Sequence, residues 1–410
     1  MSRALPPLTT RRHVMEKSVC RLRRIRSSCV CLAGFHLGIS SAERQQGAAD
    51  IGTFRYRPTV SIVLISPPEG AAALVPAVSS VTSQIYQDWQ LCIAARRGEE
   101  EATRHLLNTM EVPGRKARVI ACPGSRAPAV VAAAVLPEAT GEYFLAISPG
   151  DCLDCRALYQ LVRALQEEPA PGIVFSDEAV VGRAGLSAAV LRKPGFSPDL
   201  LMSAPYLGRM LALRTDAVRR TGGIRTGTGV AWEYDLALRL TADGQGVTRI
   251  PSVLYYSRSR SPGMTGSAGN DGSEPVMQVL RDHLAGEHSG ATVERGIVPG
   301  TFRVKRKICG EPLVSLIVPT KDRLDLLEPC IRSLVSGSTY RNTEILIIDN
   351  CSSEPSTLAY LSRIVQEHPT IRVIPYDRPF HPSAIKNTAT REARGDYLLF
   401  LNNDIEVISA

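Results

Sequence analysis

The sequence is poor in aromatic residues and has no long apolar run. Aromatic residues make up 5% of the 410 positions. The apolar segment at residues 127–136 is far shorter than the ~20 residues that a membrane-spanning helix needs. The apolar piece at residues 30–37 contains His36 and is too short for a signal peptide. We therefore expect a soluble, cytoplasmic protein.

The ten cysteines form no repeated spacing that would indicate a disulfide framework. Cys152 and Cys155 make a lone C-x-x-C, without the second pair or the paired histidines that complete a zinc tetrahedron. Small buried thiols are therefore favoured over a metal or redox site.

Several catalytic motifs are also missing from the sequence. It contains no G-x-x-x-x-G-K-[ST], H-E-x-x-H or G-x-S-x-G, and the G-T-G at residues 227–229 lacks the third glycine of a dinucleotide loop. These absences argue against a P-loop nucleotidase, a zinc protease, a serine hydrolase and a Rossmann dehydrogenase.

The positive charge is concentrated at the start of the chain. The formal net charge is +8, and residues 1–55 hold ten Lys and Arg against three acidic residues. A basic tail of this kind attracts an anionic membrane surface or nucleic acid without specificity. The alternatives are a solvated tail or a misassigned start codon. We predict a disordered tail over residues 1–55, no specific nucleic-acid partner, and leave open peripheral contact with the inner face of the membrane.

What the sequence does contain is an internal duplication. Residues 395–404 form an apolar run that ends in a polar, acidic tip, and residues 141–150 repeat its shape 254 positions earlier. The same offset relates Tyr86 to Tyr340 and residues 60–63 to 314–317. A repeat of this length indicates tandem domains.

Each copy alternates apolar strands with helical spacing, which predicts an α/β fold with a mostly parallel sheet flanked by helices. Strands are expected at 59–65, 89–94, 117–121, 314–320, 344–349 and 371–375, and helices at 71–83, 99–110, 325–335 and 356–367. We predict a first domain at 56–260, a linker with a helix at 261–310, and a second domain at 311–410 that contains only the N-terminal, nucleotide-binding half of the fold.

Four ordered motifs of the second copy resemble those of the family 2 glycosyltransferases. They are residues 314–323 (VSLIVPTKDR), 347–350 (IIDN), 383–387 (SAIKN) and 401–404 (LNND). In the first copy the resemblance extends to residues 176–178, 193–200 and 233–236. The chain is most similar to two-domain bacterial enzymes of O-antigen and exopolysaccharide assembly, often labelled rhamnosyltransferase-like. The resemblance implies tandem GT-A domains, the Rossmann-like fold of nucleotide-diphospho-sugar transferases.

The resemblance also implies a set of site residues. Asp349 corresponds to the aspartate that contacts the base, and Asp404 with Asn402 corresponds to a D-x-D-type motif for Mg²⁺ or Mn²⁺. An acidic residue at the start of a helix serves as general base, and Glu233 matches it with Asp235 nearby. The remaining nucleotide-binding positions are Pro319, Thr320, Asp322 and Asn387.

The first copy lacks the donor-site residues of the second. Ala95 stands where the second copy has Asp349, and Ser148 and Gly150 stand where it has Asn402 and Asp404. Its tip offers neither metal ligands nor a cation for a diphosphate leaving group, so we predict no turnover of nucleotide sugar there. The alternative is that Asp151 alone holds a metal.

The function that the resemblance implies is inverting, metal-assisted transfer of a hexose or deoxyhexose. The donor is a nucleoside-diphosphate sugar, and the acceptor is a glycan or lipid-linked glycan of a growing cell-surface polysaccharide. The alternative is a non-catalytic glycan-binding or scaffold protein that descends from such an enzyme.

Overall fold

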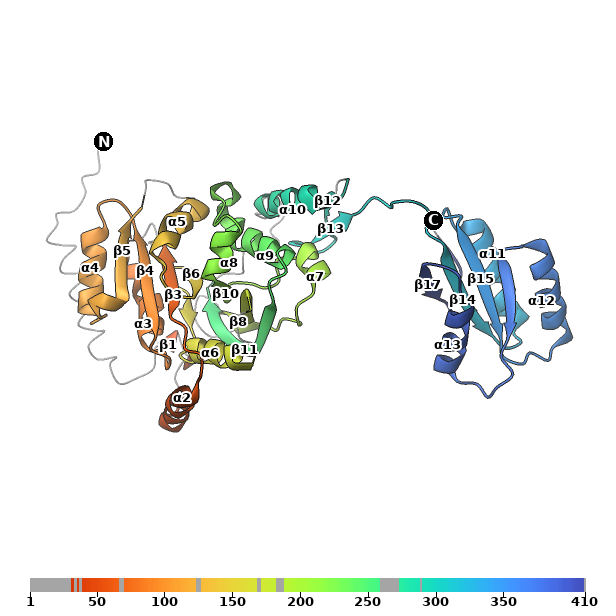
Figure 1. Ribbon diagram of the computed structural model, residues 1–410, viewed down its shortest axis with the longest axis horizontal. Helices are drawn as coiled ribbons and strands as arrows, with labels where there is room; N and C mark the ends of the chain where they lie inside the picture. Colours follow the sequence, from red (N-terminus) through yellow and green to blue (C-terminus); the bar gives the residue numbers. More distant parts are fainter. Residues whose placement is uncertain are drawn as a thin grey trace. The chain divides into compact units, whose positions relative to one another are not determined.

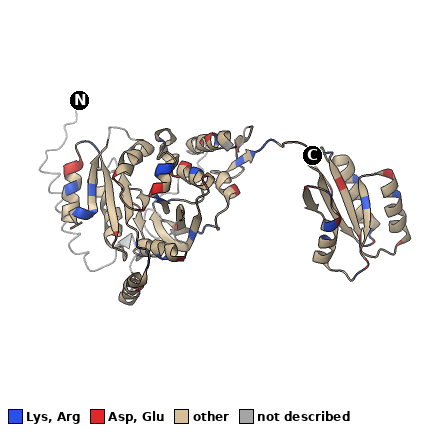
Figure 2. Ribbon diagram, viewed as in Figure 1, with Lys and Arg blue, Asp and Glu red and all other residues tan. Residues whose placement is uncertain are grey.

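The chain divides into two compact units in the computed structural model, Met1–Arg306 (unit 1) and Lys307–Ala410 (unit 2) (Figure 1). Residues of both charge signs are interspersed over the elements of each unit (Figure 2). The structure describes residues 31–32, 35–36, 39–65, 70–122, 127–167, 171–181, 188–258, 273–287 and 290–408.

Unit 1 is built on a nine-stranded sheet of order β5-β4-β3-β6-β10-β8-β11-β7, with β9 paired to β8. Strands β3 to β6 are parallel, and β10 runs antiparallel to both β6 and β8. The strands are β3 (Val60–Ile65), β4 (Trp89–Ala95), β5 (Ala117–Ala121), β6 (Tyr143–Ile147), β7 (Cys152–Leu153), β8 (Ile173–Val181), β9 (Ala188–Leu191), β10 (Leu211–Arg214) and β11 (Val247–Ser257).

Helices cover both faces of this sheet, because successive strand residues point to opposite sides. In β3, Ile62 and Leu64 belong to one buried cluster, whereas Val63 belongs to the other. The helices are α3 (Val75–Thr82), α4 (Glu100–Thr109), α5 (Pro128–Val135), α6 (Ala157–Glu167), α7 (Pro198–Ser203), α8 (Thr215–Arg220), α9 (Trp232–Ala242) and α10 (Ser273–Glu287), with 3-10 turns η1 (Ala71–Leu74), η2 (Gly114–Lys116), η3 (Leu136–Glu138) and η4 (Thr226–Ala231).

Unit 2 repeats the first four strands of unit 1. Its all-parallel sheet has the order β16-β15-β14-β17, which matches β5-β4-β3-β6. The strands are β14 (Val314–Thr320), β15 (Thr343–Asp349), β16 (Ile371–Pro375) and β17 (Tyr397–Phe400), and the helices are α11 (Leu324–Gly337), α12 (Pro355–Glu367) and α13 (Pro382–Glu392). The predicted α/β class is therefore confirmed, and β14 and β16 have the predicted bounds.

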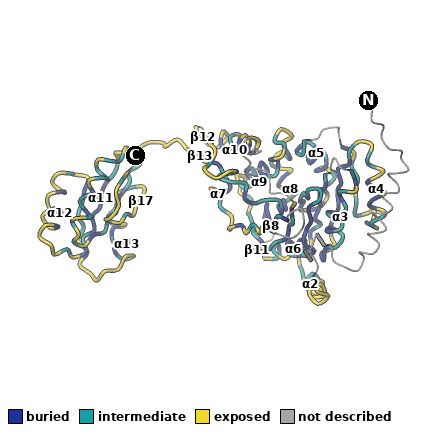
Figure 3. The backbone as a smooth tube through the Cα atoms, turned by 180° about the vertical axis from the view of Figure 1, so that it is seen from behind, coloured by how far each residue is buried: buried dark blue, intermediate teal, exposed yellow. Residues whose placement is uncertain are grey.

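The last strand of the repeat differs between the units. All four residues of β17 are exposed (Figure 3), whereas most of β6 is buried. The reason is that β10 pairs along the second edge of β6, while β17 pairs only with β14 in the described part of unit 2. Unit 2 thus contains the equivalent of the first half of unit 1.

A glycine at the start of this last strand fixes its position in both units. The amide of Gly141 donates to Ser61 Oγ, and the amide of Gly395 donates to Ser315 Oγ, each at 2.9 Å. A Cβ atom on Gly141 would lie 2.5 Å from the carbonyl oxygen of Thr59, and one on Gly395 would lie 2.7 Å from that of Leu313. The backbones therefore approach too closely for any side chain at these two positions.

The predicted disordered tail is wrong for its last residues. Helix α2 (Ser41–Thr53) begins with a capping box between Ser40 and Glu43, a signal that the sequence carries. Tyr159 donates a hydrogen bond to Asp50 at 2.6 Å, and Phe54 stacks on the Tyr159 ring. Two short strands, β1 (Cys31–Leu32) and β2 (Phe35–His36), also pair with each other, and residues 1–30 lie outside the described part.

The predicted linker also needs correction, since its helix and the hairpin that follows it fold onto unit 1. Val276 and Leu280 of α10 are buried in the same cluster as Trp232, as is Phe302 of the hairpin formed by β12 (Thr292–Arg295) and β13 (Phe302–Lys305). Residues 259–272 lie outside the described part. Across the described helices, none is long and apolar enough to cross a membrane.

We expect Gly141→Ala to lower the free energy of unfolding of unit 1 by about 1–3 kcal/mol, because the added methyl group overpacks the contact with β3. Urea unfolding followed by tryptophan fluorescence reports on this unit, since both tryptophans, Trp89 and Trp232, lie in it. The control is Gly114→Ala, where a Cβ meets nothing within 4 Å. Equal stability of the two variants would contradict the close-approach argument.

Candidate active site

The predicted nucleotide-binding residues of unit 2 gather where its parallel strands end. Thr320 and Asp349 are direct partners in the pairing of β14 and β15, and Pro319 lies one position earlier. The side-chain amide of Asn403 donates from Nδ2 to Thr320 Oγ1 at 3.2 Å. This bond brings the turn after β17 to the same edge. The carboxyl edge of an open parallel sheet is where ligands bind in this class of fold.

Two of the acidic residues at this edge already shape the local backbone. Asp349 accepts a hydrogen bond from the amide of Ser352 at 3.1 Å. Asp322 accepts from the amides of Ser353 and Glu354, the two residues directly before α12, at 2.7 and 2.8 Å. These bonds lower the pKa of Asp322, and the bond from the Glu354 amide contributes most. Asp322 therefore has a structural role whether or not a ligand is bound.

The other predicted residues are exposed. Asn402 and Asp404 lie in the turn after β17, and Asn387 lies on α13, where no hydrogen bond among the described residues ties it to the strand ends. No group of three or more His, Cys, Asp or Glu side chains gathers in the described ranges. The exposed Asp404 carboxylate and Asn402 amide oxygen are hard ligands, a set that fits Mg²⁺ or Mn²⁺ when substrate phosphates complete the shell.

The corresponding edge of unit 1 is arranged differently. Asp151 is buried, and its oxygens accept hydrogen bonds from the Tyr255 hydroxyl and the Arg258 amide, both at 3.0 Å. Arg209 forms an ion pair with Asp151 at 3.5 Å and donates to Ser148 Oγ at 2.6 Å. The expectation that this tip lacks a cation is therefore wrong, because Arg209 reaches it from the start of β10.

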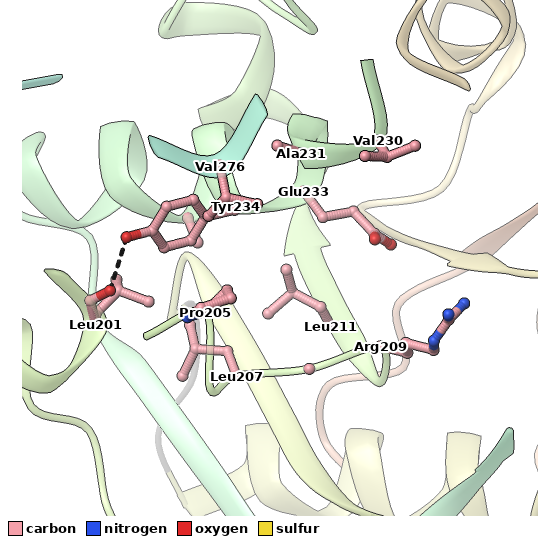
Figure 4. A pocket seen from close by; sticks show the side chains of 12 residues that line it. Leu201, Pro205, Leu207, Arg209, Leu211, Val230, Ala231, Glu233, Tyr234 and Val276 are labelled. Carbon is pink, nitrogen blue, oxygen red and sulfur yellow. Dashed lines mark hydrogen bonds between the residues drawn. The ribbon is translucent and has the colours of Figure 1, made fainter. Parts of the chain in front are cut away.

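Arg209 and Glu233 also line one pocket, which is otherwise mostly apolar (Figure 4). Their charged groups lie on the same side of it in this view. The Tyr234 hydroxyl donates to the carbonyl of Leu201 at 2.8 Å and closes the opposite side. Burial raises the pKa of Glu233 to about 7, although Arg209 acts in the other direction. A carboxyl group poised near neutrality suits general acid or base chemistry.

Asp235, the second candidate base, is held in ion pairs. It contacts Arg239 at 2.6 Å and Arg225 at 3.4 Å, and its side chain is buried. Arg239 also donates to the carbonyl oxygens of Thr221 and Gly223, both at 2.7 Å. Asp235 therefore positions the turn before α9, and only Glu233 of the pair faces the pocket.

Sequence reasoning missed Arg209, and it used Glu178 and Lys193 only as parts of the motifs at 176–178 and 193–200, without a role in the site. The buried Lys193 ammonium group lies 3.6 Å from Glu178 Oε2, and the backbone amide of Arg209 donates to that same oxygen at 3.0 Å. For Arg209, the only signal in the sequence is its position directly before the apolar run at 210–213. Its partner Ser148 is 61 residues away, so local spacing does not reveal the pair.

A parallel sheet with hydroxyl and acidic side chains at its carboxyl edge defines an α/β protein that binds its ligand at that edge. Residues 315–409 match the family described as Glycosyl transferase family 2. The chain therefore carries a family 2 glycosyltransferase domain, which confirms the family that the motifs of the second copy predicted.

Similar proteins include the O-antigen biosynthesis protein RfbC of Myxococcus xanthus, which is 30% identical over 354 residues, covering 86% of this chain and 28% of that protein. The GalNAc(5)-diNAcBac-PP-undecaprenol beta-1,3-glucosyltransferase of Campylobacter jejuni is 29% identical over 99 residues, covering 24% of this chain and 31% of that protein. The chain thus spans less than a third of the length of either relative.

Among solved structures, the mannosyltransferase PcManGT from Pyrobaculum calidifontis, in complex with GDP-Man and Mn²⁺, is similar with a TM-score of 0.41 and 16% identity. The likeness covers 60% of this chain and 70% of that one. The family assignment rests on the sequence matches.

We expect the free energy of unfolding of unit 1 to fall as pH rises from 4.5 to about 7. In this window the carboxyl group of Glu233 ionises in the unfolded chain, with its ordinary pKa of 4.5, but stays protonated in the folded one. Urea unfolding at several pH values, followed by tryptophan fluorescence, measures the slope. Glu233→Gln should flatten it, and an unchanged slope in that variant would assign the proton uptake to another group.

Proposed function

We propose that this protein transfers a hexose or deoxyhexose from a nucleoside-diphosphate sugar to a growing cell-surface polysaccharide, with inversion at the anomeric carbon. The donor nucleotide binds at the carboxyl edge of unit 2. The acceptor is a glycan or a lipid-linked glycan, in keeping with the O-antigen role that the name of the Myxococcus xanthus relative gives.

One observation carries this proposal. Inside the segment that matches the family, Thr320 and Asp349 are paired at the ends of adjacent parallel strands, and the turn with Asp404 is tied to Thr320 through Asn403. A nucleoside diphosphate presents a base, a ribose and two phosphates, which need contacts spread over several strand ends. In this proposal the Asp349 carboxylate accepts the imide hydrogen of a pyrimidine base.

Divalent metal assistance is part of the proposal, with Asp404 and Asn402 as the ligands from this chain. The ion would offset the negative charge that develops on the departing nucleoside diphosphate. The two ligands are exposed in the turn after β17, where a diphosphate can reach them.

Unit 1 holds a candidate general base of its own, which would accept the proton of an acceptor hydroxyl group bound in the pocket of that unit. Glu233 fills the matching family position in unit 1, at the start of α9 and in the wall of a pocket. With its pKa raised to about 7, its carboxylate form becomes dominant only above neutrality. A base of this kind gives a rate that increases with pH through that value.

A second function, a non-catalytic glycan-binding or scaffold role, is favoured by unit 1 alone. Its Asp151 is fully engaged by Tyr255, Arg258 and Arg209, and it has Ala95 where unit 2 has Asp349. Release of free nucleoside diphosphate from nucleotide sugars by the full chain would distinguish the enzyme from the scaffold.

We expect uridine or thymidine diphosphate to bind the full chain in a Mn²⁺-dependent way. Asp404→Ala should weaken this binding at least about tenfold, an effect typical of damage to a metal site. Isothermal titration calorimetry with and without Mn²⁺ measures both quantities.

The matched control is Glu328→Gln, which removes another carboxylate of unit 2, on α11, that pairs with Arg363. Diphosphate binding of unchanged strength and without metal dependence in Asp404→Ala would overturn the donor-site assignment.

A further inference from the structure

The tip after β6 in unit 1 has lost the oxygen ligands that the tip after β17 keeps. Ser148, Pro149 and Gly150 correspond to Asn402, Asn403 and Asp404. The nearest carboxylate is Asp151, one residue further on and only 3% exposed. The backbone at Gly150 has a φ of +81°, a left-handed conformation that disfavours most side chains.

The antiparallel pairing of β10 with β6 brings a basic side chain to this tip. Leu213 pairs with Phe144 and Arg214 with Tyr143, so the same register continued toward the tip places Arg209 opposite Ser148. The Arg209 guanidinium donates to Ser148 Oγ at 2.6 Å, and its side chain is 14% exposed. Arg209 therefore approaches the tip from the segment directly before β10, which the pairing of β10 with β6 brings next to Ser148.

We infer that Arg209 takes the place of a divalent cation in unit 1. The guanidinium group, and not a metal ion, supplies the positive charge at the tip after β6. The guanidinium lies 3.5 Å from Asp151 Oδ2, the one carboxylate left at the tip. Arginine stays protonated at every physiological pH and forms directed hydrogen bonds, so it is a permanent cation that does not dissociate. This inference concerns unit 1 and rests on the proposed metal role of the matching tip in unit 2, and the Asp404→Ala parent in the test below keeps the two questions apart.

The partners of Asp151 explain why a metal does not fit there. Its Oδ1 accepts from the Arg258 amide and its Oδ2 from the Tyr255 hydroxyl, both at 3.0 Å. A metal ion would have to displace at least one of these donors as well as Arg209. The exchange would leave a guanidinium in a poorly solvated place next to a second cation, which is costly.

Several carboxyl groups would lose the positive charge of a neighbour if Arg209 were removed. Asp151, Glu178 and Glu233 act electrostatically on it, and Lys193 is another nearby cation, 3.6 Å from Glu178. Without the guanidinium, three carboxyl groups would face a region with one cation fewer.

A purely structural reading is that Arg209 only ties β10 to β6. That reading predicts that loss of Arg209 lowers stability but creates no affinity for metal. The substitution reading predicts a new metal site, so a metal-binding measurement separates the two.

The test measures free Mn²⁺ by electron paramagnetic resonance in titrations of the full chain, with Asp404→Ala as the parent so that unit 2 contributes no site. Adding Arg209→Ala should make Mn²⁺ binding at least about tenfold tighter than in the parent, because affinity follows the number of ligand charges. Arg209→Lys keeps the cation and should show no gain. Adding Asp151→Asn to Arg209→Ala should abolish the gain.

A folded Arg209→Ala protein that gains no affinity for Mn²⁺ would overturn the inference. A second comparison covers the case in which that variant does not fold. Asp151→Asn alone in the Asp404→Ala parent should leave Mn²⁺ binding unchanged, and weaker binding would show that Asp151 holds a metal in the presence of Arg209.

Discussion

The hydrogen bond from a glycine amide to a serine hydroxyl group sets the geometry on which both units depend. Gly141 and Gly395 make this bond at the start of the last parallel strand, and Ser61 and Ser315 in the central strand accept it. A slip of one residue would turn every side chain of that strand to the opposite face. Because the register is fixed, the strands end together, and the side chains after them meet at one edge.

The two units share the arrangement of the parallel strands but differ in the side chains that follow those strands. In unit 2 Asn402 and Asp404, which follow β17, are exposed, and Asp404 can meet a ligand from solvent. In unit 1 the same edge is closed, with Asp151 buried between Tyr255 and Arg209. The strands are stabilised by buried apolar contacts on both faces, which the loss of edge ligands does not touch. A site can therefore change its chemistry while the fold persists.

Much of the candidate site was predictable, and the failures have identifiable causes. Thr320 and Asp349 end consecutive apolar strands, so a parallel sheet places them side by side. The ion pair of Asp235 with Arg239 could also be predicted from the sequence, since Arg239 lies one helical turn further on. Helix α10 was assigned to a linker because its apolar face is recognisable only against the cluster around Trp232.

The sequence by itself determined the order of strands and helices, the duplication and the family, because these depend on residue spacing within short segments and on motifs in a fixed order. Only the tertiary structure decided that Arg209 lies at the tip beside Ser148 and Asp151. That contact spans 61 residues and exists because β10 folds back antiparallel to β6. Local periodicity carries no information on such a return, so the cation of unit 1 appears only once the sheet is assembled.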